Sequence, residues 1–577
     1  MKKNIVRREY QATTNVFDEM HPLLRRVYMA RQVKSEHELE KALEHLLPFQ
    51  SLLGIDQAVA LLVDAIQRNQ RILIVGDFDA DGATSTAIAV RALRSFGATN
   101  VQFLVPNRFE FGYGLTPELV AASDAYAPEM IVTVDNGIAN HAGVLAAKDR
   151  NICVIITDHH LAAPTLPLAD AIVNPNQPDD LFPSKNLAGC GVIFYVMLAL
   201  RRELANIGWF AQKNLAEPVM SRLLDIVALG TVADLVPLDH NNRILVHQGL
   251  RRIRAGQCVP GIIALLELAS REFSRAEASD LGFAVAARLN AAGRLDDMSL
   301  GIECLLTDDS TRAREIARTL DQLNDERRSI EKDMQKQALD ALAKLSAKLE
   351  TVLPRGLCLY DETWHQGVIG ILAARIKDRF HRPVIVFAPG HDDELKGSAR
   401  SISGFHIRDA LAIVDVRHPG LIHKFGGHAM AAGLTIHQDS LDKFTKVFDE
   451  VVCEKITEAQ LQHSLLTDGE LAQEDFNLEI ASLLKEAGPW GQAFPEPLFD
   501  GVFKILEQRI VGDKHLKLRL GKEDKIIDAI AFFVDTNVWP NHRCEHIQAA
   551  YKLDINEYKG KRNIQLIVEY LEAIAVN

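Results

Sequence analysis

The sequence predicts an α/β protein of several domains whose C-terminal region is built from β-strands. The chain has 577 residues, more than one hydrophobic core normally supports, so we expect about two to four domains. Between about residues 50 and 160, short apolar runs alternate with helical patterns, which is typical of buried parallel strands joined by helices. After about residue 465 the pattern changes to consecutive strands.

The composition is that of a folded globular protein. Hydrophobic residues make up 47% of the chain, and the formal net charge is −13. The N-terminus has no apolar signal segment, and no apolar run approaches the ~20 residues that span a bilayer. Seven cysteines are scattered without a C-x-x-C pair, which favours a reducing cytoplasm and excludes a disulfide framework or a zinc site. The net negative charge argues against a protein that binds nucleic acid over most of its surface, but it is compatible with a local basic groove.

The elements of the first α/β region follow in order. Strands are predicted at 71–75 (RILIV), 101–106 (VQFLVP), 130–134 (MIVTV) and 153–157 (CVIIT), with helices near 83–96, 117–125 and 141–150. Residues 190–300 have mainly helical patterns. Residues 311–349 are rich in charge, lack Gly and Pro and follow a capping DDS segment, so we expect one helix of ~60 Å.

Two further regions complete the predicted architecture. A second α/β region covers about 353–455, with strands in GLCLY and PVIVFA. Beyond it, strands are predicted in HLKLRL, IIDAIAFFV, IQAAYKLDI and NIQLIVEYL.

Acidic and imidazole side chains follow three of the predicted strands, at the point where each strand ends. They are Asp77, Asp79, Asp81, Asp135, Asp158, His159 and His160. The carboxyl ends of parallel strands share one edge of a sheet, so these side chains should gather there. A single aspartate would as readily cap a helix, but three strand ends together favour cations. Carboxylates with imidazoles suit Mn²⁺ or Mg²⁺, and this number of ligands suffices for two ions ~3.5–4 Å apart that share a carboxylate.

Ordered motifs along the chain resemble a known family. GDFDADGATST (76–86), TVDNGI (133–138), TDHH (157–160) and LGTVADLVPL (229–238) are similar to the motifs of the DHH phosphoesterase superfamily. RLNAAGRLDD (288–297), WHQGVIGILAARI (364–376), GSARS (397–401) and KFGGHAMAAG (424–433) resemble the RecJ-type single-strand-specific exonucleases, as do GPWGQAFPEPLFDG (488–501) and YKLDINEYKGKRNIQLIVEY (551–570). The resemblance covers about residues 15–575.

The resemblance implies a cytoplasmic exonuclease that degrades single-stranded DNA from the 5′ end to mononucleotides in recombination and repair. It also implies an N-terminal extension (1–50), a parallel-sheet DHH domain (51–305), a linking helix (306–352), a DHH-associated domain (353–460) and an OB-fold-like barrel (461–577). The expected partners are single-stranded DNA, single-strand-binding protein and repair or recombination proteins. We expect a monomer that makes no contact with a membrane.

The resemblance also assigns metal ligands. The predicted ligands of two Mn²⁺ or Mg²⁺ ions are Asp77, Asp79, Asp81, Asp135, His159 and Asp234. Asp79 would bind one ion and Asp81 the other, and Asp135 would bridge both. His159 and Asp234 would complete the second site. Water activated by the ions would then attack phosphorus in line, without a covalent enzyme intermediate.

Two further residues are expected beside the ions. Asp158 would orient His159, as carboxylates often do for ligating imidazoles, and His160 would face the scissile phosphate. These two residues and the bridging aspartate form the predicted catalytic set. Val75 stands where many relatives carry a histidine ligand of the first site. Asp77 or water would take the place of that imidazole.

Substrate-binding residues are predicted in four motifs, each with a structural alternative. Arg288, Arg294 and Arg400 would hold phosphates, since guanidinium groups bind them bidentately; a helix-end salt bridge is the alternative for the first two. His428 follows two glycines and would contact a phosphate or cap a loop. Trp364 and His365 would contact a nucleotide or lie in the core.

The C-terminal strands carry basic residues that would track a single strand. Lys517 and Arg519 alternate along HLKLRL and therefore share one face, with Lys514 and His515 nearby. Lys559, Lys561 and Arg562 follow in EYKGKR, where Tyr558 is a weak candidate for base stacking. An ordinary solvated strand face is the alternative.

Two other functions remain open. Some DHH-like chains are metal-free scaffolds for DNA or replication proteins, but every main motif acid is present here. Others are phosphoesterases that act on pyrophosphate, cyclic dinucleotides or short RNA, which the long C-terminal β region disfavours.

Overall fold

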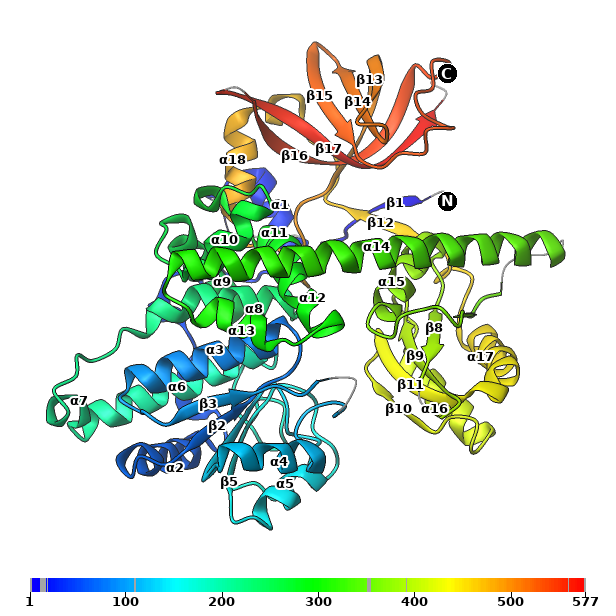
Figure 1. Cartoon of the computed structure of the whole chain (residues 1–577). Coiled ribbons are helices and arrows are strands. Elements are labelled where there is room, and N and C mark those ends of the chain that lie inside the picture. The colour runs from blue at the N-terminus through cyan, green and yellow to red at the C-terminus, as the bar shows by residue number, and fades with distance from the viewer. Residues whose placement is uncertain are drawn as a thin grey trace. The chain divides into compact units, whose positions relative to one another are not determined.

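The computed structural model describes residues 3–10, 17, 19–107, 111–349, 354–390, 392–558 and 560–574 (Figure 1). The chain forms two compact units. The N-terminal unit comprises residues 10–324 and 482–496, and the C-terminal unit comprises residues 1–9, 325–481 and 497–577.

The N-terminal unit is built on a five-stranded parallel sheet of order β3-β2-β4-β5-β6. Its strands are β2 (Ile72–Val75), β3 (Val101–Leu104), β4 (Met130–Val134), β5 (Cys153–Thr157) and β6 (Ala171–Val173). The central strands β2 and β4 are buried at every position, which explains their unbroken apolar sequences.

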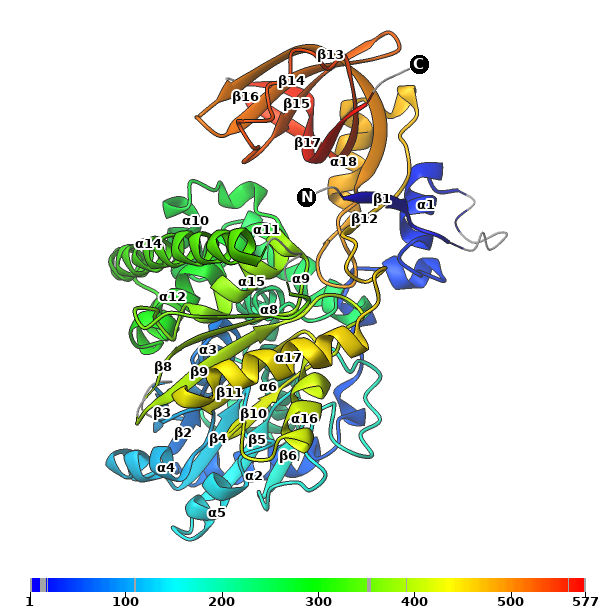
Figure 2. The ribbon, with the colours of Figure 1, turned by 90° about the vertical axis from the view of Figure 1, so that its right-hand side faces the viewer.

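Helices cover both faces of this sheet. Leu73 and Val75 of β2 pack with Leu119 of α4 and Val144 of α5 on one face, while α3 and α6 lie on the other (Figures 1 and 2). The helices along this part of the chain are α1 (Pro22–Met29), α2 (Ile55–Gln67), α3 (Ala80–Ser95), α4 (Pro117–Ser123), α5 (His141–Lys148), α6 (Gly189–Asn206) and α7 (Trp209–Gln212).

The rest of the N-terminal unit is helical, as predicted for 190–300. It contains α8 (Leu224–Ala233), α9 (His240–Arg254), α10 (Pro260–Leu268), α11 (Ala278–Asp280), the π-helix η7 (Leu281–Ala286), α12 (Ala287–Leu295) and α13 (Ser299–Leu306). The long helix α14 (Ser310–Leu349) then begins in this unit and ends in the other. At ~1.5 Å per residue it spans ~60 Å, so the prediction of one long helix is confirmed.

The C-terminal unit contains a mixed sheet of order β10-β11-β9-β8-β7, in which only β7 and β8 are parallel. Helices α14 and α15 pack on one face through residues such as Met334 and Leu372, and α16 and α17 cover the other (Figure 2). The elements are β7 (Leu357–Tyr360), α15 (Ile369–Phe380), β8 (Val384–Pro389), β9 (Glu394–Arg400), α16 (Ile407–Arg417), β10 (Lys424–Gly427), β11 (Ala431–His437) and α17 (Leu441–Lys455).

The last strands form a closed barrel of order β13-β14-β15-β17-β16. They are β13 (Phe499–Val511), β14 (His515–Lys522), β15 (Lys525–Ala531), β16 (His546–Tyr558) and β17 (Lys561–Ile574). Before the barrel come β12 (Ser464–Thr467), which pairs in parallel with β1 (Asn4–Arg7), and α18 (Leu478–Ala487). The predicted α/β class with a C-terminal β-barrel is confirmed.

Sequence patterns missed several strands and one helix start. The three-residue strand β6, the polar strand β9, the glycine-rich β10 and the long strand β13 were not predicted, because none is a short apolar run of the kind on which the prediction rested. Helix α3 begins at Ala80 rather than near 83, because Asp79 caps it. Lys559 lies outside the described residues, and nothing is described of the Tyr558 side chain.

Of the described helices, none is by itself long and apolar enough to cross a membrane. One bent pair, residues 43–51 with Ile55–Gln67, meets the length and composition criteria together, with a bend of 88°.

Candidate metal centre

The turn between β2 and α3 gathers the first group of carboxylates. Asp79 is the N-cap of α3, and its Oδ1 accepts hydrogen bonds from the backbone N–H groups of Asp81 and Gly82, each at 3.0 Å. A side chain at Gly82 would lie 2.5 Å from the carbonyl oxygen of Asp77, so only glycine lets the helix start so close to the turn. Asp79 therefore caps a helix, which was the structural alternative to metal binding. The cap uses Oδ1, so Oδ2 of Asp79 can still contact a cation.

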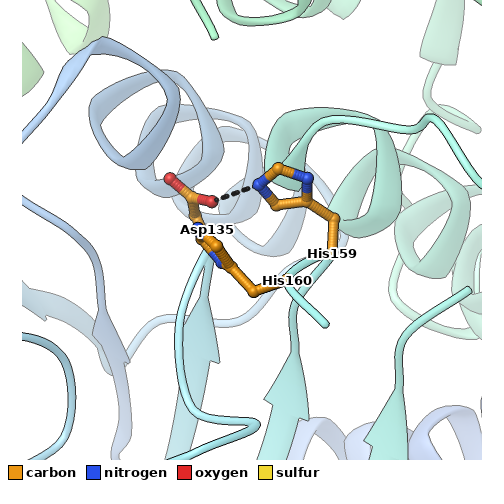
Figure 3. A group of neighbouring side chains, drawn as sticks. All are labelled: Asp135, His159 and His160. Carbon is orange, nitrogen blue, oxygen red and sulfur yellow. Dashed lines mark ion pairs between the residues drawn. The ribbon is translucent and has the colours of Figure 1, made fainter. Parts of the chain in front are cut away.

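The ends of β4 and β5 supply the next group. Asp135 follows β4 with a positive φ of 62°, and its backbone N–H donates to the carbonyl of Thr157 at the end of β5. His159 follows β5, and its Nε2 lies 3.1 Å from Oδ1 of Asp135 (Figure 3). The two side chains point toward one another from neighbouring strands, as expected for residues at the carboxyl edge of a parallel sheet.

Asp234 joins the cluster from a different element, the C-cap of α8. His159 Nε2 lies 3.4 Å from Oδ2 of Asp234 and 4.0 Å from Oδ2 of Asp81. The structure thus brings together every predicted metal ligand.

The ligand atoms form three overlapping groups, each compact enough for one ion. The groups are Asp77, Asp79 and Asp135; Asp81, His159 and Asp234; and Asp135, His159 and His160. The first group contains only carboxylates, which agrees with Val75 in place of an imidazole. Asp135 belongs to the first and third groups, and its Oδ1 lies 3.1 Å from Nε2 of His159, a member of the second group.

The donor set fits divalent cations. Carboxylate oxygens with one imidazole are ligands that Mn²⁺ and Mg²⁺ accept, and no cysteine belongs to any of these groups of described residues. Oδ1 of Asp135 is buried, and although Nε2 of His159 lies 3.1 Å away, it accepts no well-formed hydrogen bond from the part of the chain that the structure describes. A buried carboxylate oxygen without a donor is costly unless a cation neutralises it.

The electrostatics of the cluster support the same conclusion. Burial, followed by the charge of Asp79, raises the pKa of Asp81 to about 6. Burial and the neighbouring carboxylates raise the pKa of Asp135 and of Asp234 well above the ordinary value. The carboxylates therefore resist ionisation together, and a bound cation would relieve that repulsion.

Asp158 orients a different histidine from the one expected. Its Oδ1 lies 2.7 Å from Nδ1 of His160, and its Oδ2 accepts the backbone N–H of Ile138. Its Oδ1 also accepts the backbone N–H of His159, at 2.7 Å. The ring partner that the structure gives Asp158 is therefore His160 and not the predicted His159, although the two imidazoles lie side by side with 4.4 Å between their ring centroids.

The pair of Asp158 and His160 is held in its charged form. Although burial opposes it, the charge and hydrogen bond of His160 lower the pKa of Asp158 to about 2. Burial likewise opposes the charge on His160, but Asp158 raises the pKa of that imidazole to about 9. An imidazolium beside the metal ligands is suited to hold an anionic phosphate oxygen.

Sequence reasoning missed Tyr113. Its hydroxyl donates to the backbone carbonyl of Asp135 at 3.3 Å and lies 3.3 Å from Nε2 of His160. In the sequence, the only hint was that Tyr113 stands between two glycines. In the structure, Gly112 and Gly114 both have positive φ and hold Tyr113 in a tight turn.

The RLNAAGR motif lies against the metal-binding turn. Asn290 Oδ1 accepts the backbone N–H of Ala80, and a side chain at Gly293 would lie 1.8 Å from the carbonyl of Phe78. Arg288 is buried, and its Nε donates to Asp321 at 2.8 Å. This is the salt bridge considered above as the alternative to a phosphate contact. The half-buried Arg294 lies on the same helix, and its phosphate contact stays a prediction.

The predicted substrate residues of the second α/β region lie in the C-terminal unit. Arg400 on β9 donates to Ser398 Oγ and to the carbonyl of Ala399, and it has no carboxylate partner among the described residues. His428 is exposed between β10 and β11. Trp364 is buried and donates to Gln337, so its core alternative is the observed one.

The barrel face predicted to be basic has mixed charge. Lys517 and Arg519 point outward from β14 and line a hollow of about 1160 Å³. Arg519 pairs with Glu507 at 2.7 Å and lies opposite Asp528 on β15. Lys517 is therefore the better candidate for a phosphate contact.

Comparison with known proteins gives the family. Residues 71–231 match the DHH family N-terminal domain, residues 352–454 the DHHA1 domain and residues 467–570 the RecJ OB domain. The chain is 56% identical over 568 residues to the single-stranded-DNA-specific exonuclease RecJ of Dickeya dadantii, covering 98% of both chains. It is 54% identical to the protein of that name from Escherichia coli, again over 98% of both. The chain belongs to the RecJ family.

Solved RecJ structures share this fold. RecJ from Thermus thermophilus in complex with Mn²⁺ matches with a TM-score of 0.80 and 29% identity, covering 97% of this chain and 77% of that one. The same protein in complex with Mg²⁺ matches with a TM-score of 0.74 and 26% identity, covering 97% of this chain and 76% of that one. The RecJ fold therefore extends over both units.

Proposed function

We propose that this protein is a metal-dependent exonuclease specific for single-stranded DNA, which it degrades from the 5′ end to mononucleotides in recombination and repair. The observation that carries the proposal is that two groups of potential ligands, Asp77, Asp79 and Asp135 and, beside them, Asp81, His159 and Asp234, meet in one cluster, where Oδ1 of Asp135 lies 3.1 Å from Nε2 of His159. Family membership supports the substrate, because the curated RecJ relatives are named single-stranded-DNA-specific exonucleases.

Mn²⁺ or Mg²⁺ is the proposed cofactor. Asp77, Asp79 and Asp135 would hold one ion, and Asp81, His159 and Asp234 would hold the other, with Asp135 shared. When bound, such ions activate a water as nucleophile and stabilise the charge that develops on the phosphate oxygens.

The remaining residues position the phosphate. The charged His160, held by Asp158, would donate to a non-bridging oxygen of the scissile phosphate. Tyr113 limits the rotation of that imidazole from the other side. Arg294, Arg400, His428 and Lys517 are proposed to contact other phosphates of the strand.

The proposal includes the domain boundaries at 50, 305, 352 and 460, a monomeric state and a cytoplasmic location. Single-strand-binding protein and repair proteins are the proposed partners. All seven cysteines are free, which supports a reducing compartment.

Digestion of 5′-labelled and 3′-labelled single strands with Mg²⁺ or Mn²⁺ tests the function. We expect the 5′ label to be released first, as a mononucleotide, and no release in EDTA. Binding of DNA without cleavage would instead indicate a scaffold. Hydrolysis of pyrophosphate or cyclic dinucleotides with intact DNA would indicate a small-substrate phosphoesterase.

A further inference from the structure

The first turn of α6 lies against the proposed metal ligands, which its backbone contacts. Its N-cap is Ala188, which has no side-chain oxygen to accept the free N–H groups of the first turn. Those donors find a different acceptor. The N–H of Gly189 donates to Oδ2 of Asp81 at 2.6 Å, and the N–H of Cys190 donates to Oδ1 at 3.0 Å.

This arrangement fixes a buried carboxylate from two sides. Asp81 lies in the first turn of α3, and both of its oxygens are held by another helix that begins 108 residues further along the chain. Backbone donors cannot rotate away as a side chain would, so the carboxylate plane is set by the fold. The positive end of the α6 dipole also favours negative charge at this position.

Gly189 has a second contact, with Asp135. A side chain added at Gly189 would place its Cβ 2.5 Å from Cβ and 2.7 Å from Oδ1 of Asp135. Real Cβ atoms do not approach other atoms so closely, so any larger residue would push the Asp135 side chain away. A Cβ at Gly230 on α8 would also come within 2.9 Å of Oδ1 of Asp81, but it would first meet Thr84 Oγ1 at 2.2 Å and Cys190 Sγ at 2.6 Å.

We propose that the first turn of α6 is a positioning element for the metal site: its backbone orients Asp81, and the missing side chain of Gly189 leaves the space that the Asp135 carboxylate occupies in the cluster. Gly189 is thus a positioning residue that acts through Asp135. The inference rests on the proposed metal site and deepens it, since it explains why two carboxylates from different elements meet with fixed orientations.

The test compares Gly189→Ala with Gly191→Ala in the full chain. Gly191 lies on the same helix, but the three atoms nearest to a Cβ there all belong to the Leu187 side chain, the first at 3.1 Å, and this side chain can adjust. Mn²⁺ affinity is measured by calorimetric titration, and folding by circular dichroism in EDTA. We expect Gly189→Ala to weaken Mn²⁺ binding by ~10–100-fold, the usual cost of changing groups that orient metal ligands. Gly191→Ala should stay within about twofold of the wild type.

A double-mutant cycle shows whether the effect passes through Asp135. Asp135→Gly removes the side chain that Gly189→Ala would displace, and its positive φ suits glycine. In that background, adding Gly189→Ala should change neither the residual Mn²⁺ affinity nor the thermal midpoint. If Gly189→Ala alone fails to fold, the double variant should fold.

The inference would be overturned if Gly189→Ala bound Mn²⁺ with wild-type affinity, or if Gly191→Ala lost as much Mn²⁺ affinity as Gly189→Ala. It would also be overturned if Gly189→Ala lowered the Mn²⁺ affinity of the Asp135→Gly variant as much as it lowers that of the wild type, or if the double variant failed to fold. None of these bears on the proposed function, which stands or falls with Mn²⁺ binding and strand digestion by the wild-type protein.

Discussion

At the scale of single residues, the metal centre depends on side chains whose charges conflict without a cation. Asp135 is the clearest case. It lies at the end of β4 with a positive φ, its Oδ1 lies 3.1 Å from Nε2 of His159 without a well-formed hydrogen bond, and burial and nearby carboxylates raise its pKa well above the ordinary value. Sequence reasoning found it because a strand-end aspartate recurs at three neighbouring strands. The partner of Asp158 could not be found in this way, because the direction of a histidine ring depends on local turns rather than on strand order.

Asp135→Asn should lower the hydrolysis rate by more than about a hundredfold, since changes in groups that only support ligands already cost up to that. Asparagine keeps the size of the side chain and tolerates the positive φ, so the fold should be retained. Single-turnover cleavage at saturating Mn²⁺ measures the loss. Retention of more than a few per cent of the wild-type rate would contradict the bridging role.

The same carboxylates predict how the stability of the metal-free protein depends on pH. The pKa of Asp81 rises from 3.8 to about 6 on folding, so its ionisation destabilises the fold fully above pH 6, and this penalty disappears as the pH falls toward 3.8. The raised pKa of His160, about 9, acts in the same direction, since its stabilising charge is lost as pH rises through that value. In EDTA, the thermal midpoint should therefore rise as pH falls from about 8 to about 6.5; below that, His247 and His463, whose pKa values burial lowers to about 4, act in the opposite direction.

Saturating Mn²⁺ should weaken this pH dependence, because the ion favours the ionised carboxylates. Asp135→Asn should also weaken it in EDTA, since one repelling charge is gone. Differential scanning calorimetry at several pH values makes the comparison. A midpoint in EDTA that falls over that range would show that these charges do not limit the stability of the metal-free fold.

At the scale of elements, strand β14 shows why alternation of charge in a sequence is a weak sign of DNA binding. The pattern placed Lys517 and Arg519 on one outward face, and the barrel does so. Pairing between strands then places Glu507 and Asp528 beside Arg519, which no pattern within β14 reveals. Part of the expected positive charge is thus neutralised within the protein.

Lys517→Ala should therefore flatten the salt dependence of single-strand binding by ~0.7 in log–log slope, the value of one lost phosphate contact. Arg519→Ala should change it less, because that guanidinium already has a partner. Glu507→Gln is the matched control, since it frees Arg519 and should steepen the slope. Affinity across a salt series measures all three, and identical slopes would show that this face does not contact the strand.

At the scale of the whole molecule, each of the two units is assembled from segments that are not consecutive in the chain. Apolar runs predicted both α/β regions and most of the barrel, and a charged segment without Gly or Pro predicted helix α14, because each depends on local sequence patterns. They could not predict that residues 482–496 leave the C-terminal unit to pack on the N-terminal one, or that residues 1–9 join the C-terminal unit through β1. Such contacts depend on side chains hundreds of residues apart.

The segment 482–496 is held by stacked rings in the N-terminal unit. Trp490 stacks on Phe494 at 5.1 Å and lies near Tyr28, while Arg31 lies over its indole ring at 5.2 Å. The Tyr28 hydroxyl donates to the carbonyl of Ala487. The aromatic residues of the GPWGQAFPEPLFDG motif therefore attach the segment to the N-terminal unit.

Trp490→Ala should destabilise the N-terminal unit by about 2 kcal/mol, less than a fully buried tryptophan because the ring is only half-buried. Trp490→Phe keeps a ring for stacking and should lose less than half of that. Urea unfolding followed by circular dichroism measures both. Equal losses in the two variants would mean that stacking is not what holds the segment.

The central claim is that two cations occupy one carboxylate cluster with Asp135 between them. A crystal of this protein grown with Mn²⁺, measured at the manganese absorption edge, tests it directly. We predict two anomalous peaks ~3.5–4 Å apart, one among Asp77, Asp79 and Asp135 and the other among Asp81, His159 and Asp234. A single peak that does not contact Asp135, or no peak in the cluster at saturating Mn²⁺, would contradict the account.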